Sequence, residues 1–247
     1  MSKTQHYKIL NALGRACHGG SYVYDLPVQR HDGTWIPGAW TDPIDDIAAC
    51  QRGYHTTTQR NILSWLGERI WRCEVRTTRD AGDKFVSRQI RLTSGTCWDD
   101  TTARLFAVQC ALDVLPLYEQ RHPDDTRVSD CLVTAWEFAH GLVGDIERAA
   151  AWAAAWAAAG AAWAAWSAGA AGAAWAAGAA EAAAGSAGAA GAAGAAWAAT
   201  GAAGDAAGAA AGAARDAAGD AQSKRLIRYL DGNIPLFPEW LTGRTTR

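Results

Sequence analysis

Hydrophobic and polar residues alternate in two runs of the amino-terminal third of the chain. The runs RIWRCEVR (69–76) and KFVSRQIRL (84–92) place apolar residues at about every second position, which is the period of a half-buried β-strand. The shorter runs YKIL (7–10) and SYVYDL (21–26) also favour strands, and turn-forming clusters separate the runs. The segment TQRNILSWLG between strands predicts one short helix that ends at Gly67. We therefore predict a small α+β domain over residues 1–98.

The apolar pattern changes to a helical period after residue 98. Residues 99–122 carry apolar side chains on one helical stripe, with acidic residues and threonine at the start. Pro116 is expected to kink or end this helix. After the turn HPDD, residues 126–142 predict a second amphipathic helix. We predict that residues 99–147 form a helical hairpin that connects the amino-terminal domain to the rest of the chain.

Residues 148–230 are built almost entirely from alanine, glycine and tryptophan. Alanine has the highest helix propensity and no proline interrupts the run, so the pattern predicts helix. The non-alanine residues recur with a mean spacing of about 3.35 from Trp152 to Gly219, which is shorter than the coiled-coil spacing of about 3.5. We expect a mainly α repeat packed as a helical hairpin, stack or bundle, followed by a carboxyl-terminal tail over residues 231–247.

The glycines of this repeat suggest close packing between helices. Each glycine inside a helix costs about 1 kcal/mol relative to alanine, so a helix with this composition needs an offsetting contact. Our hypothesis is that indole rings fill notches left by glycines, within one chain or between chains. The predicted packing residues are Trp152, Trp156, Trp163, Trp166, Trp175, Gly185, Gly188, Gly191, Gly194, Gly204, Gly208 and Gly212. The alternative is a drifting tripeptide repeat that is tolerated without any packing role.

Composition narrows the expected partners. A formal net charge of −2 and a pI near 6.3 argue against a nucleic-acid partner, and alanine and glycine drive membrane insertion only weakly. The amino terminus shows no apolar run followed by a small-residue cleavage site, which predicts a cytoplasmic location. The six cysteines include no CxxC pair and are expected to be free thiols. We expect no metal and no cofactor.

Two segments carry a family resemblance. The Gly53–Tyr54–His55 stretch precedes a short helix, a strand that contains Glu74, and a turn with Asp83 and Lys84. This order resembles the amino-terminal domain of uncharacterised proteins from actinobacteria and their phages. Residues 107–141 resemble the helical pair of proteins labelled as immunity proteins, which continue into an alanine-rich tail. The resemblance implies this architecture and a bacterial or phage origin, and it carries no activity.

From these features we expect a non-enzymatic accessory protein that acts by binding or self-assembly through the alanine-rich region. It would block or sequester a host component, as a homo-oligomer or with a protein partner. If the protein is phage-encoded, its location is the cytoplasm of the host cell.

The segment around Gly53 also supports an alternative hypothesis, that the protein is an enzyme. The stretch RGYHTTT (52–58), followed by a helix and then WRCEVR, is similar in outline to ADP-ribosyltransferases, which bind NAD beside an aromatic-histidine motif and use a catalytic glutamate. The resemblance implies a site centred on Gly53–Thr58, with His55 and Glu74 as candidate catalytic residues. The family's second aromatic motif and a later glutamate in its usual context are absent. From the residues alone, His55 is expected to be structural and Glu74 to be a solvent-facing carboxylate.

Overall fold

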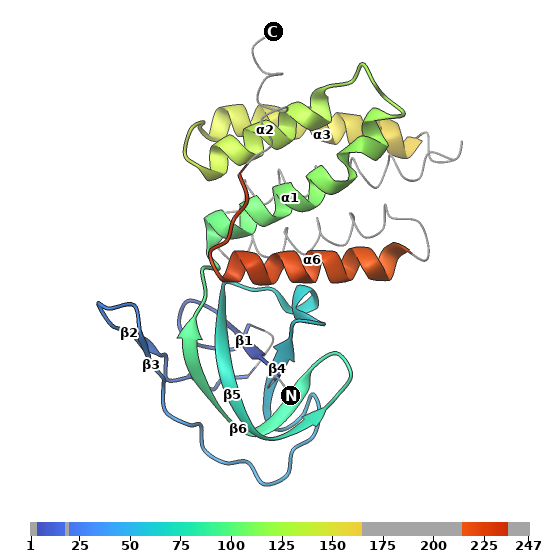
Figure 1. The fold of residues 1–247 in the computed structure, drawn as a ribbon. Coiled ribbons are helices and arrows are strands. Elements are labelled where there is room, and N and C mark those ends of the chain that lie inside the picture. The colour runs from blue at the N-terminus through green and yellow to red at the C-terminus, as the bar shows by residue number, and fades with distance from the viewer. Residues whose placement is uncertain (1–3, 18–19, 165–213, 237–247) are drawn as a thin grey trace. The chain divides into compact units, whose positions relative to one another are not determined.

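The computed structural model describes residues 4–17, 20–164 and 214–236. Within these residues the chain has a mixed α/β content, with a strand-rich part followed by four α-helices (Figure 1). It divides into two compact units. The first unit ends at Trp98 and also includes Leu230–Gly232, and the second begins at Asp99 and includes the chain up to Tyr229.

The first unit is built around a small closed barrel of antiparallel strands (Figure 1). The barrel order is β1 (His6–Leu10), β4 (Tyr54–Thr58), β6 (Phe85–Gly95) and β5 (Arg69–Asp80), and β5 closes it by pairing with β1. The two strongly alternating runs are β5 and β6, so both strand predictions are confirmed. Their hairpin turns at Gly82, whose φ of 89° suits the left-handed region that glycine adopts without strain.

Alternating side chains of the strands fill the barrel interior. Leu10, Tyr54, Cys73, Ile90 and Leu92 are buried together there. Short strands suffice because a closed barrel satisfies the backbone hydrogen bonds of all its strands and leaves no open edge.

The loops around the barrel differ from the sequence expectation. The run SYVYDL is not a strand: it makes one isolated bridge between Val23 and Arg15, and the Tyr24 amide donates to the Gly14 carbonyl at 3.0 Å. Tyr24 nevertheless packs into the barrel core. The predicted short helix is a 3-10 turn, η1 (Ile62–Trp65). A separate two-stranded sheet pairs β2 (Val28–Gln29) with β3 (Trp35–Ile36).

The second unit contains the α-helices. They are α1 (Asp100–Glu119), α2 (Arg127–Ala139), α3 (Asp145–Ala164) and α6 (Ala214–Leu230). Asp99 caps α1 by accepting a hydrogen bond from the Thr102 amide at 2.8 Å. Of the two alternatives for Pro116, a kink or a helix end, the second does not occur, because α1 continues to Glu119. Its apolar face also continues through the buried Leu115 and Tyr118, and the packing of that face outweighs one lost backbone hydrogen bond.

Side-chain contacts hold helix α6 against α1. The Phe106 and Tyr229 rings meet edge to face with their centroids 5.6 Å apart. Arg225 forms a two-pronged ion pair with Asp113, in which one bond is 2.9 Å long.

Only the two ends of the alanine-rich region fall within the described residues. Both ends are helical, as α3 and α6, in agreement with the helix prediction there. Trp152 lies on α3 with 40% of its surface exposed, and Trp156 and Trp163 belong to the same helix. The remaining predicted packing residues, Trp166, Trp175 and the glycines from Gly185 to Gly212, lie outside the described residues. In the part that is described, no helix has both the length and the apolar character needed to cross a membrane.

Candidate functional site

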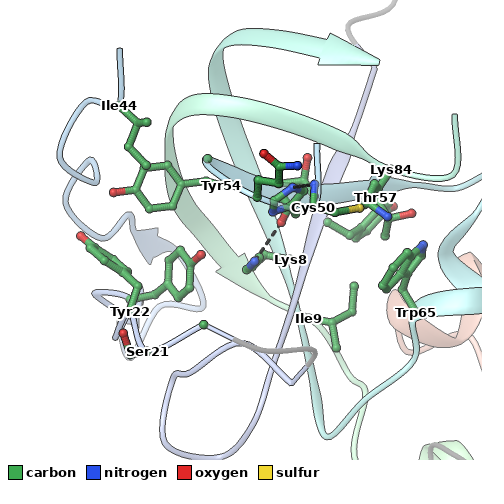
Figure 2. A pocket seen from close by; sticks show the side chains of 17 residues that line it. Lys8, Ile9, Ser21, Tyr22, Ile44, Cys50, Tyr54, Thr57, Trp65 and Lys84 are labelled. Atoms are coloured by element: carbon green, nitrogen blue, oxygen red, sulfur yellow. Dashed lines mark hydrogen bonds between the residues drawn. The ribbon is translucent and has the colours of Figure 1, made fainter. Parts of the chain in front are cut away.

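A cavity of about 540 Å³ lies in the first unit, against strands β1 and β4 of the barrel. Its volume falls within the range of small-molecule sites. Figure 2 shows Lys8 at the centre, with Tyr22 and Tyr54 on one side and Trp65 and Lys84 on the other. Lysine, histidine, tyrosine, threonine, serine, glutamine and cysteine supply its polar groups, and no aspartate or glutamate belongs to the described lining.

Lys8 is the most unusual side chain of this cavity. It comes from the middle of β1, which is buried along its whole length, and only 6% of its surface is exposed. Its ammonium group donates a hydrogen bond to the His55 carbonyl at 2.8 Å and lies 4.9 Å from the centre of the Tyr24 ring. Burial lowers the pKa of Lys8 to about 8, because a low-dielectric surrounding disfavours the charged form.

His55 lies beside Lys8 on β4 and is held through its ring. The ring Nε2 accepts a hydrogen bond from the Cys50 amide at 3.1 Å. Cys50 has a φ of 62°, a left-handed conformation that is costly for a residue other than glycine. Burial, and then the charges of Lys8 and Lys84, lower the pKa of His55, so its ring is neutral at pH 7.

A second lysine, Lys84, reaches the cavity from the turn between β5 and β6. Its ammonium group is 3.2 Å from Asp83 and 4.8 Å from the centre of the Trp65 ring. Burial by itself would lower the pKa of Lys84, but its hydrogen bonds to Cys50 and Asp83 raise the value overall. Lys84 therefore stays charged at neutral pH, whereas Lys8 is close to its titration point.

Three tyrosines form an aromatic wall opposite Trp65. The Tyr22 ring lies edge to face with Tyr24 at 5.0 Å and with Tyr54 at 5.3 Å between centroids. The Tyr54 hydroxyl donates to the Asp42 carbonyl at 3.0 Å, which fixes the orientation of its ring. Rings held in this way offer flat apolar surface for another ring.

The two candidate catalytic residues of the enzyme hypothesis do not meet in this cavity. His55 lines it together with Gly53, Tyr54, Thr56 and Thr57. Glu74 is not part of the described lining, and its carboxylate accepts from Arg91 at 2.7 and 2.8 Å. The reason is the strand period, since Cys73 on β5 points into the core and Glu74 therefore faces the other side.

The sequence pattern gives Lys8, Tyr22 and Tyr24 no role in a site, and it gives Tyr54 and Lys84 only a place in the family resemblance. The one available signal was a lysine inside the apolar run YKIL, and an alternating strand normally turns such a lysine to solvent.

The cysteines and histidines offer no metal centre in the described part of the chain. All six cysteines are free thiols, as expected. No group of three or more metal-ligating side chains comes together among the described residues.

Comparison of the chain with protein-family models, with curated proteins and with solved structures found no match in any of the three.

Proposed function

We propose that this protein is a binding protein whose barrel captures a small planar anion in the Lys8 cavity. The observation that carries the proposal is a lysine with 6% exposure lining a cavity of about 540 Å³. A buried ammonium group is costly unless an opposite charge or enough hydrogen bonds compensate it. No carboxylate of the described residues forms an ion pair with Lys8, so a bound anion would supply that compensation.

The aromatic side chains favour a ligand with a ring. Tyr22 and Tyr54 face the cavity from one side and Trp65 from the other (Figure 2), and Tyr24 also lines it. A flat ring can stack between such walls while a carboxylate or phosphate on the ring reaches Lys8 or Lys84. We therefore propose an aromatic acid or a comparable ring-bearing anion as the ligand class.

Removing the charge of Lys8 is expected to weaken anion binding by at least about tenfold, since a charge-assisted hydrogen bond contributes about 1.5–3 kcal/mol. The measurement is calorimetric titration of the intact protein and of Lys8→Met with 4-(hydroxymethyl)benzoate. Methionine keeps the length of the side chain and its burial without the charge. A circular dichroism spectrum of the variant verifies that it folds.

The same titration has a pH dependence with a defined sign. The anion prefers the ammonium form, so its affinity for the intact protein should fall as the pH rises through about 8, the pKa of free Lys8. Lys8→Met should lack this step. Equal affinity of the two proteins, or a flat pH profile for the intact one, contradicts the proposal.

The alanine-rich region would serve the binding protein as its assembly or partner surface. This part of the proposal rests on the sequence pattern of tryptophans and glycines. Trp152, on α3, has 40% of its surface exposed. The accessory role, by blocking or sequestering another component, remains a proposal of the same kind.

An NAD-dependent ADP-ribosyltransferase is the second candidate, because Gly53, His55 and Thr57 all line the cavity. The pairing of Glu74 with Arg91 outside the lining supports binding over transfer. We expect no transfer of labelled ADP-ribose from NAD by the intact protein. Transfer that is lost in Glu74→Gln but kept in Glu137→Gln, a matched change on α2, would establish the enzyme instead.

A further inference from the structure

Lys8 has the surroundings of a reactive amine. Its nitrogen lies in a cavity large enough for a small molecule, next to the His55 carbonyl at 2.8 Å and the Tyr24 ring. The hydrogen bond to the His55 carbonyl occupies one of the three donor positions of the ammonium group. The rest of the group therefore has no hydrogen-bond partner among the described residues, on a side chain that is more than nine-tenths buried.

The two lysines of the cavity have different surroundings and therefore different chemistry. Lys84 is fixed as an ammonium by Asp83 and Cys50 and can only attract an anion. Lys8 has no such anionic neighbour, and a desolvated lysine loses its proton readily and becomes a nucleophile. Paired groups whose surroundings push their protonation in opposite directions are typical of sites where one binds and the other reacts.

The groups that face Lys8 do not oppose the loss of its proton. They are His55 on β4, Tyr24 and Cys17 in the loop after β1, and Cys73 on β5. His55 has a lowered pKa and Tyr24 a raised one, both first because of burial, so both are neutral at pH 7. Burial likewise raises the pKa values of Cys17 and Cys73, which keeps both thiols protonated.

We propose that the Lys8 amine forms an imine with a planar anionic aldehyde or ketone that enters the cavity. The selection of an anionic ring rests on the function proposed above. In the covalent step Lys84 binds the anionic group, and Lys8, whose ammonium form attracts the anion, reacts in its neutral form. The nitrogen lone pair of neutral Lys8 attacks the carbonyl carbon, and the C=O π electrons move to the oxygen. A proton passes from nitrogen to that oxygen, giving a carbinolamine. Loss of the oxygen as water then gives the C=N bond, with no net oxidation or reduction.

The test is reductive trapping of the full-length protein with 4-carboxybenzaldehyde. Sodium cyanoborohydride reduces an imine to a stable secondary amine, and peptide mass spectrometry locates it. The chain has only four lysines, Lys3, Lys8, Lys84 and Lys224, so the map is simple. We expect Lys8 to be labelled at least about tenfold faster than Lys224, because each unit by which a pKa is lowered makes the neutral amine about ten times more abundant.

The pH profile and a variant separate a specific imine from general labelling. Labelling of Lys8 should rise with pH and level off above about 8, as expected when the reacting amine is a desolvated lysine. Lys8→Arg keeps the positive charge but lacks the primary amine, so it should lose the label while the other lysines react as before. Labelling of Lys8 no faster than that of Lys224 overturns the inference.

The alcohol 4-(hydroxymethyl)benzoate has the same ring and carboxylate as the aldehyde but cannot form an imine. It therefore distinguishes the two proposals when trapping fails. If 4-(hydroxymethyl)benzoate binds to the intact protein but the aldehyde leaves Lys8 unlabelled, the imine is wrong and the anion site stands. If neither compound engages the cavity, both proposals are wrong. The comparison within the intact protein does not depend on whether a variant folds.

Discussion

Replacing Gly53 with alanine is expected to lower the free energy of unfolding of the barrel unit by about 3 kcal/mol. Gly53 precedes β4 with a φ of 126°, a backbone conformation that side-chain-bearing residues rarely adopt. A Cβ there would come within 2.5 Å of the Val86 Cγ2 atom and 3.3 Å of the Ser87 carbonyl oxygen. Val86 is fully buried on β6, so a shift of its side chain would disturb the packed core around it. Urea denaturation followed by near-ultraviolet circular dichroism would measure the loss.

Gly82→Ala provides the matched control for this change. Gly82 also has a positive φ, of 89°, but a Cβ at that position meets nothing within 4 Å. Its substitution should cost only the backbone strain, about 1–2 kcal/mol. If Gly53→Ala lowers the free energy of unfolding no more than Gly82→Ala does, the close approach of Gly53 to Val86 is wrong. Gly53→Ala should also weaken anion binding, because Gly53 and the adjoining strand line the Lys8 cavity.

Truncating Phe106 to alanine is expected to destabilise the helical unit by about 3–5 kcal/mol, the usual cost of removing a buried aromatic ring. Phe106 has no exposed surface on α1, and its ring meets Tyr229 of α6 edge to face. The change leaves a cavity between the two helices, and α6 loses its main ring contact. Thermal unfolding gives the magnitude, and hydrogen exchange should show faster exchange of the α6 amides.

Trp152→Ala, on α3, is the variant to compare with Phe106→Ala. Trp152 is 40% exposed on α3, so its removal from a monomer should cost about 1 kcal/mol or less. A larger loss that grows with protein concentration would indicate that this indole is buried in an assembly, as the proposed role of the alanine-rich region requires. Phe106→Ala should show no such dependence. A Phe106→Ala loss as small as that of Trp152→Ala would falsify the packing of α1 against α6.

The sequence by itself determined the elements whose pattern is local. The strands β5 and β6 were predictable because their apolar residues alternate over nearly the whole run, and such alternation specifies which face is buried. The helices α1 and α2 followed from a stripe of apolar residues, and Asp99 marked the start of α1. The free state of the cysteines followed from their spacing and number.

The sequence also pointed to one wall of the candidate site. The Gly53–Thr58 segment was singled out, and five of its residues, Gly53 to Thr57, line the cavity. Its secondary structure was not predicted: the segment forms the strand β4 (Tyr54–Thr58). Its five residues are too few and too polar for a period to be read, and pairing with β1 and β6 makes it a strand.

Only the tertiary structure decided the chemistry of the cavity. A single alternating strand in solution would turn Lys8 outward, but β1 closes the barrel and is covered on both faces, so its lysine is buried. Tyr22 and Tyr24 reach the same cavity from a loop with no regular hydrogen bonding, and Lys84 reaches it from a turn. Glu74, close to Cys73 in sequence, lies on the opposite face with Arg91. Burial and charge compensation are properties of contacts between distant segments, whereas a sequence pattern fixes only the local conformation from which those contacts are made.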